Sequence, residues 1–182
     1  MNKLFDVNLS PTQFEEEVAK LIRRQGIGLS EFEVKKLEKI SVQDGIYEID
    51  ITARFEVLGV SFLVLIECKH HKNPIKREVV QILHDRLRAV GGHKGIIFST
   101  ARFQHGAIEY AQVHGIALIQ IVNKNIDHSG RIDRAAGFPI LPRDWDSLYD
   151  GQIVSLNEEG NKRQFFVGHP KYLLERFNSS AT

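Results

Sequence analysis

The sequence predicts an α/β fold, in which a mixed β-sheet is flanked by helices. Residues 60–122 alternate between short apolar runs, which are typical of buried strands, and segments with apolar residues at helical spacing. Such an alternation implies right-handed crossovers and therefore a parallel part of the sheet. Residues 46–69 differ, because two strand-like runs are separated by only two residues, as in an antiparallel hairpin. Parallel and antiparallel pairs together make a mixed sheet.

An amphipathic helix is predicted ahead of the first strand. Ser10 and Gln13 have the spacing of a capping box, and Pro11 occupies the first helical position, where proline is favoured. Apolar residues then recur at helical spacing up to Gly26: Phe14, Val18, Leu21 and Ile22. We therefore expect a helix that begins at Pro11 and ends near Gly26.

Three strands are predicted next. Residues 32–42 suggest the first, with a bulge at residues 35–37, where the alternation of apolar and polar residues breaks. Residues 46–57 alternate strictly, which is typical of a half-buried strand. Residues 60–66 are almost continuously apolar, as expected of a strand covered on both faces. The second and third runs therefore predict a hairpin beside a third strand.

The loop of that hairpin determines which residues face each other. If residues 58 and 59 form a two-residue loop, the positions of paired residues sum to 117. Asp50 then lies directly opposite Glu67, and Lys69 lies on the same face. The hairpin would therefore gather three charged side chains at the point where the apolar run ends.

Two helix–strand pairs are predicted after the hairpin. A helix can start at Asn73-Pro74 and stop at Gly91-Gly92, with the apolar stripe Ile75, Val79, Ile82, Leu83, Leu87 and Val90. A strand at residues 95–99, a helix at 103–114 and a strand at 116–122 follow. The predicted order is helix, three strands, helix, strand, helix, strand.

The residues after Val122 are less periodic. Residues 152–156 and 164–167 can pair as strands across a turn, and residues 171–177 suggest a short helix. We therefore divide the chain into a core domain, residues 1–122, and a C-terminal extension, residues 123–182, that we expect to pack on the core.

Composition excludes several classes of protein. A chain of 182 residues with 42% hydrophobic and 26% charged content fits one globular domain rather than a disordered chain. The N-terminal residues lack the apolar run of a signal peptide, and no stretch approaches the length of a membrane span. The single cysteine, Cys68, cannot form an internal disulfide. We expect a cytoplasmic location and no membrane partner.

Positive charge is concentrated in one segment, although the net charge of the chain is only +1. Residues 68–94 contain seven Lys or Arg against two acidic residues, a local balance of +5. A polyanionic backbone needs such a basic flank, because phosphate contacts provide most non-specific affinity. Charge clusters of this size are also common on solvated faces, so the segment alone does not identify DNA as a partner.

The three charged hairpin residues suit metal-assisted hydrolysis. Two carboxylates about 5 Å apart at the backbone repel each other unless a cation lies between them, and Mg²⁺ prefers carboxylate oxygens. Lys69 would orient a water molecule or neutralise charge that develops on a phosphate. The alternative is an ordinary cross-strand ion pair, which contributes only about 0.2–1 kcal/mol. A functional site is favoured because Glu67 and Lys69 extend the most apolar strand of the chain. A charge at such a position is costly to bury unless it serves a purpose.

The chain resembles the Mrr-type restriction endonucleases of the PD-(D/E)xK nuclease superfamily over residues 10–122. The matching segments are Phe14-Glu15, Ile49-Asp50, Glu67-Cys68-Lys69, the helix from Ile75, residues 95–100 and residues 115–119. The resemblance implies a restriction endonuclease-like αβββαβ core with an additional αβ unit. It also implies cleavage of DNA that depends on Mg²⁺, for which Mn²⁺ substitutes, and a product that carries a 5′-phosphate.

The resemblance implies roles for four residues. Asp50 and Glu67 would bind the metal, Lys69 would act on the attacking water, and Glu15 is a secondary candidate for completing the metal shell. Two departures from the family pattern exist: Ile49 replaces the proline that names the motif, and the glycine-rich approach to the aspartate is reduced to Asp44-Gly45 with Tyr47-Glu48 inserted. The second departure bears on access of the substrate.

Other residues are candidates for contacting DNA. The basic segment offers Lys72, Lys76 and Arg77, and Gln81 is a secondary candidate that would orient water or contact a phosphate. His70 and His71 follow Lys69 directly and read more simply as exposed loop residues.

Three functions are compatible with these observations. The first is a metal-dependent DNA endonuclease, the second a non-catalytic or partner-dependent DNA-binding module with the same fold, and the third an interaction protein with a structural ion-pair patch. Cutting both strands of a duplex usually requires two sites, so a homodimer is compatible with the first function, although the sequence identifies no interface. The DNA sequence, methylation or shape that is recognised stays open.

Overall fold

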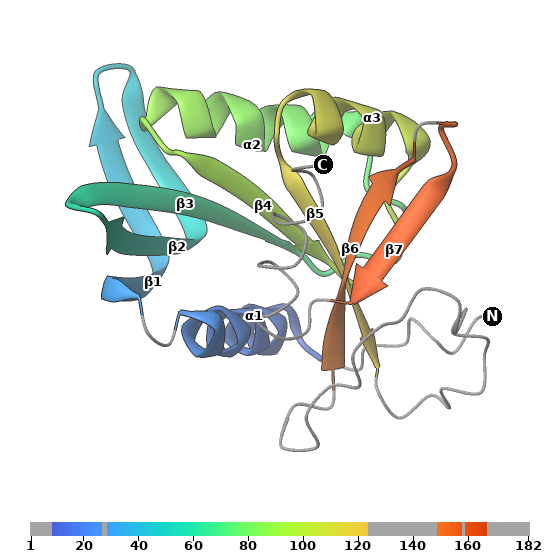
Figure 1. Ribbon diagram of the computed structural model, residues 1–182, viewed down its shortest axis with the longest axis horizontal. Helices are drawn as coiled ribbons and strands as arrows, with labels where there is room; N and C mark the ends of the chain where they lie inside the picture. The colour runs from blue at the N-terminus through green and yellow to red at the C-terminus, as the bar shows by residue number, and fades with distance from the viewer. Residues whose placement is uncertain (1–8, 27–28, 124–148, 158, 167–182) are drawn as a thin grey trace.

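The computed structural model describes residues 9–26, 29–123, 149–157 and 159–166 (Figure 1). Within these segments seven strands form one sheet, and their order in space is their order in the sequence. Helix α1 lies on one face of the sheet, and α2 and α3 lie side by side on the other (Figure 1). The prediction of a mixed β-sheet flanked by helices is confirmed.

Helix α1, Pro11–Gln25, begins as the sequence predicts. The Ser10 side chain accepts a hydrogen bond from the Gln13 backbone at 3.2 Å, and the Gln13 side chain accepts one from the Ser10 backbone at 2.8 Å. This capping box satisfies two backbone groups that a helix start leaves unpaired. Phe14, Val18 and Ala19 are buried against the sheet, so the apolar stripe provides the packing energy.

Strands β1 (Ser30–Val42), β2 (Gly45–Val57) and β3 (Val60–Lys69) form an antiparallel meander. The β2–β3 pairs run from Val57↔Val60 to Ile51↔Ile66, so paired positions sum to 117 as predicted. Leu58 and Gly59 have φ values of 54° and 77°, which is the geometry of a tight two-residue hairpin turn. The register on which the site prediction depends is therefore confirmed.

Two predictions about these strands are wrong. The register shift of β1 lies between Ser30 and Glu33, not at residues 35–37, although Leu37 does adopt a positive φ of 50°. Strand β2 is not half-buried, because its middle is covered on both faces. Thr52, on the polar face, is 0% exposed and donates to Glu38 of β1 at 2.6 Å. A polar side chain tolerates this burial because its hydroxyl is paired.

Helix α2, Arg77–Ala89, starts four residues after Asn73. Ile75 instead bridges to Phe103, and its N–H and C=O bond to Arg102 and Gln104. These backbone groups are thus unavailable to a helix. Ile82, assigned to the buried stripe, is 52% exposed, because Val80, Leu83 and Leu87 form the inner face.

The remaining elements complete the sheet. Strand β4 (Lys94–Ser99) is parallel to β3 and β5 (Ala117–Asn123), and α3 (His105–Val113) connects β4 to β5. Strand β6 (Tyr149–Leu156) pairs antiparallel with β5 and with β7 (Lys162–Phe166). The predicted pairing of residues 152–156 with 164–167 is confirmed by partners such as Gln152 and Phe166. The helix expected at residues 171–177 lies outside the described segments.

Within the described segments, hydrophobic residues form a cluster on each face of the sheet. One cluster lies under α2 and α3 and includes Leu65 and Leu83, and the other lies under α1 and includes Ile66 and Phe98. Neighbouring residues of β3 thus face opposite cores, which explains its continuous apolar run. No helix of the described part is long and apolar enough to cross a membrane.

Candidate active site

The site lies where β2 and β3 separate, one residue beyond the Ile51↔Ile66 pair. Asp50 Oδ2 accepts a hydrogen bond from the Cys68 backbone N–H at 2.7 Å, which ties the carboxylate to β3. Lys69 Nζ donates to Glu67 Oε1 at 2.5 Å. The hairpin register therefore brings together the three side chains that the sequence singled out.

Glu67 is the buried centre of this site, at 6% exposure. Its second oxygen, Oε2, accepts a hydrogen bond from Arg86 Nη1 of α2 at 3.0 Å. The carboxylate thus faces two cations, which is how a protein tolerates a buried charge. From the sequence we assigned Arg86 only to the basic segment. Its position in the helix, between the inner residues Leu83 and Leu87, is the sequence feature that would have indicated a place beside the sheet.

Asp50 experiences a different electrostatic environment. Burial and then the charge of Glu67 raise its pKa above the ordinary value, while the Cys68 N–H and Lys69 oppose the rise. Glu15 of α1 adds a smaller contribution in the raising direction. Asp50 therefore lies beside the negative charges of Glu67 and Glu15, and an added cation would relieve their repulsion.

The residues present fit a divalent ion. Carboxylate oxygens are the ligands that Mg²⁺ prefers, and proteins commonly hold this ion with only one or two carboxylates, together with water and substrate phosphate. Asp50 Oδ1 has no hydrogen bond within the described part of the chain, so it is open to a ligand. The described residues contain no cluster of three or more metal-binding side chains, so Glu15 is not gathered with Asp50 and Glu67 into one.

The predicted DNA contacts lie directly after β3. Lys72, Lys76 and Arg77 are all exposed, and they occupy the loop after Lys69 and the first residue of α2. Arg77 also lies 5.0 Å over the Tyr110 ring. Gln81 is half-buried, one turn further along α2. The basic side chains therefore follow the end of β3 that carries Glu67 and Lys69.

The two histidines after Lys69 differ from each other. His71 is exposed, and its backbone N–H donates to Thr100 Oγ1 at 3.1 Å, which fixes the loop to the end of β4. His70 is not the exposed loop residue that we expected. Its ring packs 5.8 Å from that of Phe14, and its Nε2 is buried without a hydrogen-bond partner among the described residues. Placement beside α1, which the local sequence does not reveal, explains the difference.

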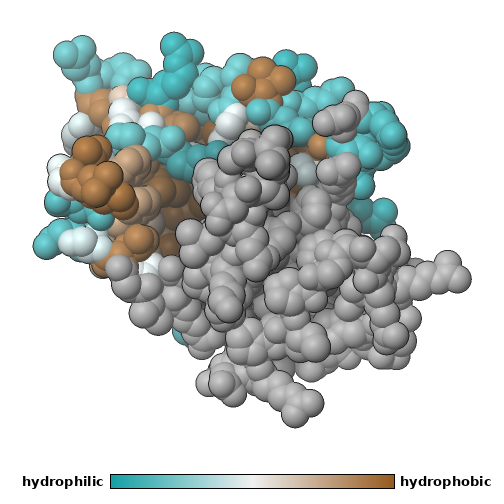
Figure 2. All heavy atoms as spheres, viewed as in Figure 1, coloured by the Kyte–Doolittle hydropathy of each residue, from teal (hydrophilic) through white to brown (hydrophobic). Residues whose placement is uncertain are grey.

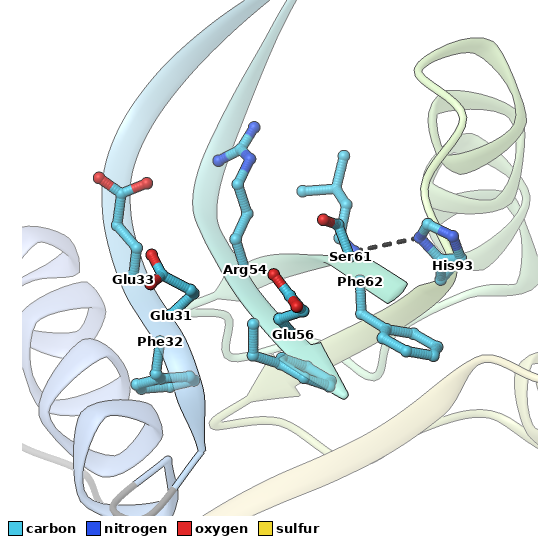
Figure 3. Close-up of a pocket in the computed structure, with 10 residues that line it drawn as sticks. Glu31, Phe32, Glu33, Arg54, Glu56, Ser61, Phe62 and His93 are labelled. Atoms are coloured by element: carbon cyan, nitrogen blue, oxygen red, sulfur yellow. Dashed lines mark hydrogen bonds between the residues drawn. The ribbon is translucent and has the colours of Figure 1, made fainter. Parts of the chain in front are cut away.

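A separate groove of about 700 Å³ lies near the turn of the β2–β3 hairpin (Figure 3). Its charged lining residues are Glu31, Glu33, Glu56 and Arg54, a net charge of −2 with His93 neutral. Phe32 and Phe62 point away from Glu33 and Arg54 in this view (Figure 3). A groove of this sign repels a phosphate backbone, so the charges favour the basic loop for DNA.

The tip of the same hairpin is apolar. Val57, Leu58 and Val60 are 41%, 99% and 53% exposed, and Figure 2 shows hydrophobic side chains gathered at this end of the molecule. Opposite ends of the β2–β3 hairpin therefore have different surfaces: charged at Asp50 and Lys69, apolar at the turn.

Comparison with protein families gives one match. Residues 7–123 match the family model described as restriction endonuclease, of the Mrr catalytic type. This range includes the carboxylates, the lysine and the basic loop. No curated protein matches the chain.

Several solved structures are similar to this chain over part of their length, and three of them illustrate the range. AF1548, a protein of unknown function, is 28% identical with a TM-score of 0.48 over 57% of this chain and 54% of its own. Can2 from Sulfobacillus thermosulfidooxidans, in complex with cyclic tetra-adenylate, is 22% identical with a TM-score of 0.48 over 59% and 32%. The MspJI restriction endonuclease, in complex with a 27-mer oligonucleotide, is 20% identical with a TM-score of 0.39 over 57% and 23%. The chain thus spans about half of the first structure and a smaller part of the others.

Proposed function

Because this chain belongs to the Mrr-type restriction endonuclease family, we propose that it is a metal-dependent endonuclease that hydrolyses phosphodiester bonds of DNA. One observation carries the proposal: Asp50, Glu67 and Lys69 meet where β2 and β3 separate, beside an exposed basic loop. A carboxylate pair with an adjacent lysine is suited to phosphoryl chemistry, because it combines a cation site with a proton donor.

Asp50 and Glu67 would hold Mg²⁺, or Mn²⁺ in its place. When bound, the ion would polarise the phosphate and lower the pKa of a water molecule. Glu15 is half-buried on α1 and acts on Asp50 through its charge, so it would support the ion electrostatically from outside the ligand pair. The burial of Glu67 keeps one ligand in a fixed orientation, which preorganises the site.

Lys69 has the chemistry to position the nucleophile. Its ammonium group carries three donors, and the bond to Glu67 Oε1 uses one of them. The remaining donors would orient a water molecule for in-line attack on phosphorus or stabilise charge on the phosphate oxygens. As in the family, the product would carry a 5′-phosphate.

Substrate binding would rest on the loop after β3. Lys72 and Lys76 are exposed and form no ion pair within the described residues, so both are available to phosphate oxygens. Arg77 presents a planar fork that suits phosphate, and Gln81 would contact the backbone or a water molecule. These contacts provide affinity and position rather than base recognition. A homodimer would supply two sites for cutting a duplex.

A DNA-binding module that does not cleave by itself is the second candidate. Lys69 and Arg86 already neutralise the buried Glu67 without a metal, as in a structural ion-pair network. Cleavage and binding must therefore be measured separately.

The test uses supercoiled plasmid, methylated and unmethylated, with Mg²⁺, Mn²⁺ or EDTA. Asp50→Asn and Lys69→Ala are expected to abolish nicking and linearisation, while the exposed controls Asp85→Asn and Lys39→Ala retain them. Intact plasmid with DNA binding preserved would support the second candidate. Metal-dependent cleavage that survives both substitutions would show that the residues are assigned wrongly.

A further inference from the structure

Arg86 is the side chain at this site to which the proposed function gives no role. Its guanidinium reaches from α2 to Glu67 Oε2, while Lys69 holds Oε1. Arg86 therefore bridges α2 and the β3 strand that carries Glu67.

The charges of this cluster balance without a metal. The two carboxylates, Lys69 and Arg86 have formal charges that cancel, so a divalent ion leaves the cluster with an excess of two positive charges. Arg86 Nη1 also lies 3.0 Å from Glu67 Oε2, an oxygen that would be a ligand of a Mg²⁺ ion. Arg86 thus competes with the ion for the same carboxylate, both electrostatically and sterically.

A DNA phosphate changes that balance. Its negative charge offsets part of the excess, and its oxygens suit the planar fork of an arginine better than one carboxylate oxygen does. The Arg86 side chain is 30% exposed, against 7% for that of Glu67, so the guanidinium has access to solvent and to a bound substrate.

We propose that Arg86 couples metal binding to DNA binding. In the free protein it pairs with Glu67 and weakens divalent-ion binding. With DNA present it transfers to a non-bridging phosphate oxygen and leaves Oε2 of Glu67 to the ion. The inference rests on the proposed function, and it makes Arg86 a positioning residue that restricts metal loading to the substrate complex. By reciprocity, the ion strengthens DNA binding by the same factor.

The test is calorimetric titration of Mn²⁺ into the full chain, alone and with a phosphorothioate-substituted duplex that resists hydrolysis. Without DNA, Arg86→Gln is expected to bind Mn²⁺ at least about fivefold more tightly than the wild type, and DNA is expected to improve its Mn²⁺ affinity less. The matched control Arg88→Gln, an exposed residue in the same last turn of α2, is expected to match the wild type. Arg86→Lys keeps the charge and is expected to restore weak metal binding.

The structural alternative predicts a different result. If Arg86 only fastens α2 to β3, Arg86→Gln lowers the melting temperature and leaves Mn²⁺ affinity and its dependence on DNA unchanged. Equal, measurable affinity in the wild type and Arg86→Gln overturns the coupling but leaves the proposed function standing. Absence of Mn²⁺ binding in both proteins, with and without DNA, overturns both.

Discussion

Glu67→Gln is expected to destabilise the metal-free protein, because the substitution leaves two cations beside a neutral buried amide. The side chain of Glu67 is 7% exposed, and its oxygens lie 2.5 Å from Lys69 Nζ and 3.0 Å from Arg86 Nη1. Removing one partner of a fully buried ion pair costs about 3–5 kcal/mol. The lysine and arginine side chains are 26% and 30% exposed, so solvent screens them in part, and we expect about 2–3 kcal/mol.

The assay is reversible urea and thermal unfolding at pH 7 in EDTA. For a chain of this size the expected loss corresponds to about 4–12 °C in melting temperature. The matched control is Glu33→Gln, since the Glu33 side chain is 51% exposed and pairs with Lys35 at 3.0 Å. An exposed pair of this kind contributes about 1 kcal/mol or less, so the control is expected to unfold close to the wild type.

A double-mutant cycle separates the ion pair from general packing. Glu67→Gln combined with Arg86→Gln is expected to cost less than the sum of the single substitutions by more than about 0.5 kcal/mol, because the residues are in contact. Additive costs, or a Glu67→Gln protein as stable as the Glu33→Gln control, would refute the reasoning that Glu67 is the centre of a buried ionic cluster.

Three further predictions concern Asp50, the basic loop after β3 and the turn of the β2–β3 hairpin. The raised pKa of Asp50 means that its contribution to stability is fully present below its ordinary value of 3.8 and is lost as pH rises through the folded-state pKa. The Asp50→Asn protein is therefore expected to melt at a higher temperature than the wild type at pH 7 in EDTA. This difference in melting temperature should vanish in acid, and a lower melting temperature of the variant at pH 7 would contradict the prediction. Lys72→Ala and Lys76→Ala each remove an exposed charge. Each substitution should reduce, by about 1, the slope of the logarithm of the DNA-binding constant against the logarithm of the salt concentration, measured by fluorescence anisotropy. An unchanged slope would show that the substituted lysine does not contact DNA. Leu58→Asn should stabilise the protein by a few tenths to about 1 kcal/mol in urea unfolding. The reason is that leucine is disfavoured at the φ of 54° that this fully solvated turn position adopts. Destabilisation would show that the apolar side chain of Leu58 has a partner.

Much of the site could be predicted because it depends on local rules. A two-residue loop after Val57 leaves only one register for the hairpin, and that register places Asp50 beside the Glu67–Lys69 end of β3. The helix start at Ser10 followed equally from side-chain chemistry within one turn. These features involve residues that are near in sequence or joined by a short loop.

The errors share a different origin. Helix α2 starts late because Ile75 bonds to the segment around Phe103, and Thr52 is buried because Glu38 of the neighbouring strand covers it. His70 is partly buried because its ring packs against Phe14 of α1. Each partner is distant in the sequence, and neither periodicity nor local propensity reports on such contacts.

The sequence by itself determined the mixed sheet, the hairpin register and the grouping of Asp50, Glu67 and Lys69, because turn geometry and the two-residue period of a strand act over short distances. Only the tertiary structure decided that Glu67 is buried and that Arg86 of α2 neutralises its second oxygen. That contact depends on how α2 packs across the sheet, which is set by the combined burial of Val80, Leu83 and Leu87 rather than by Arg86 itself.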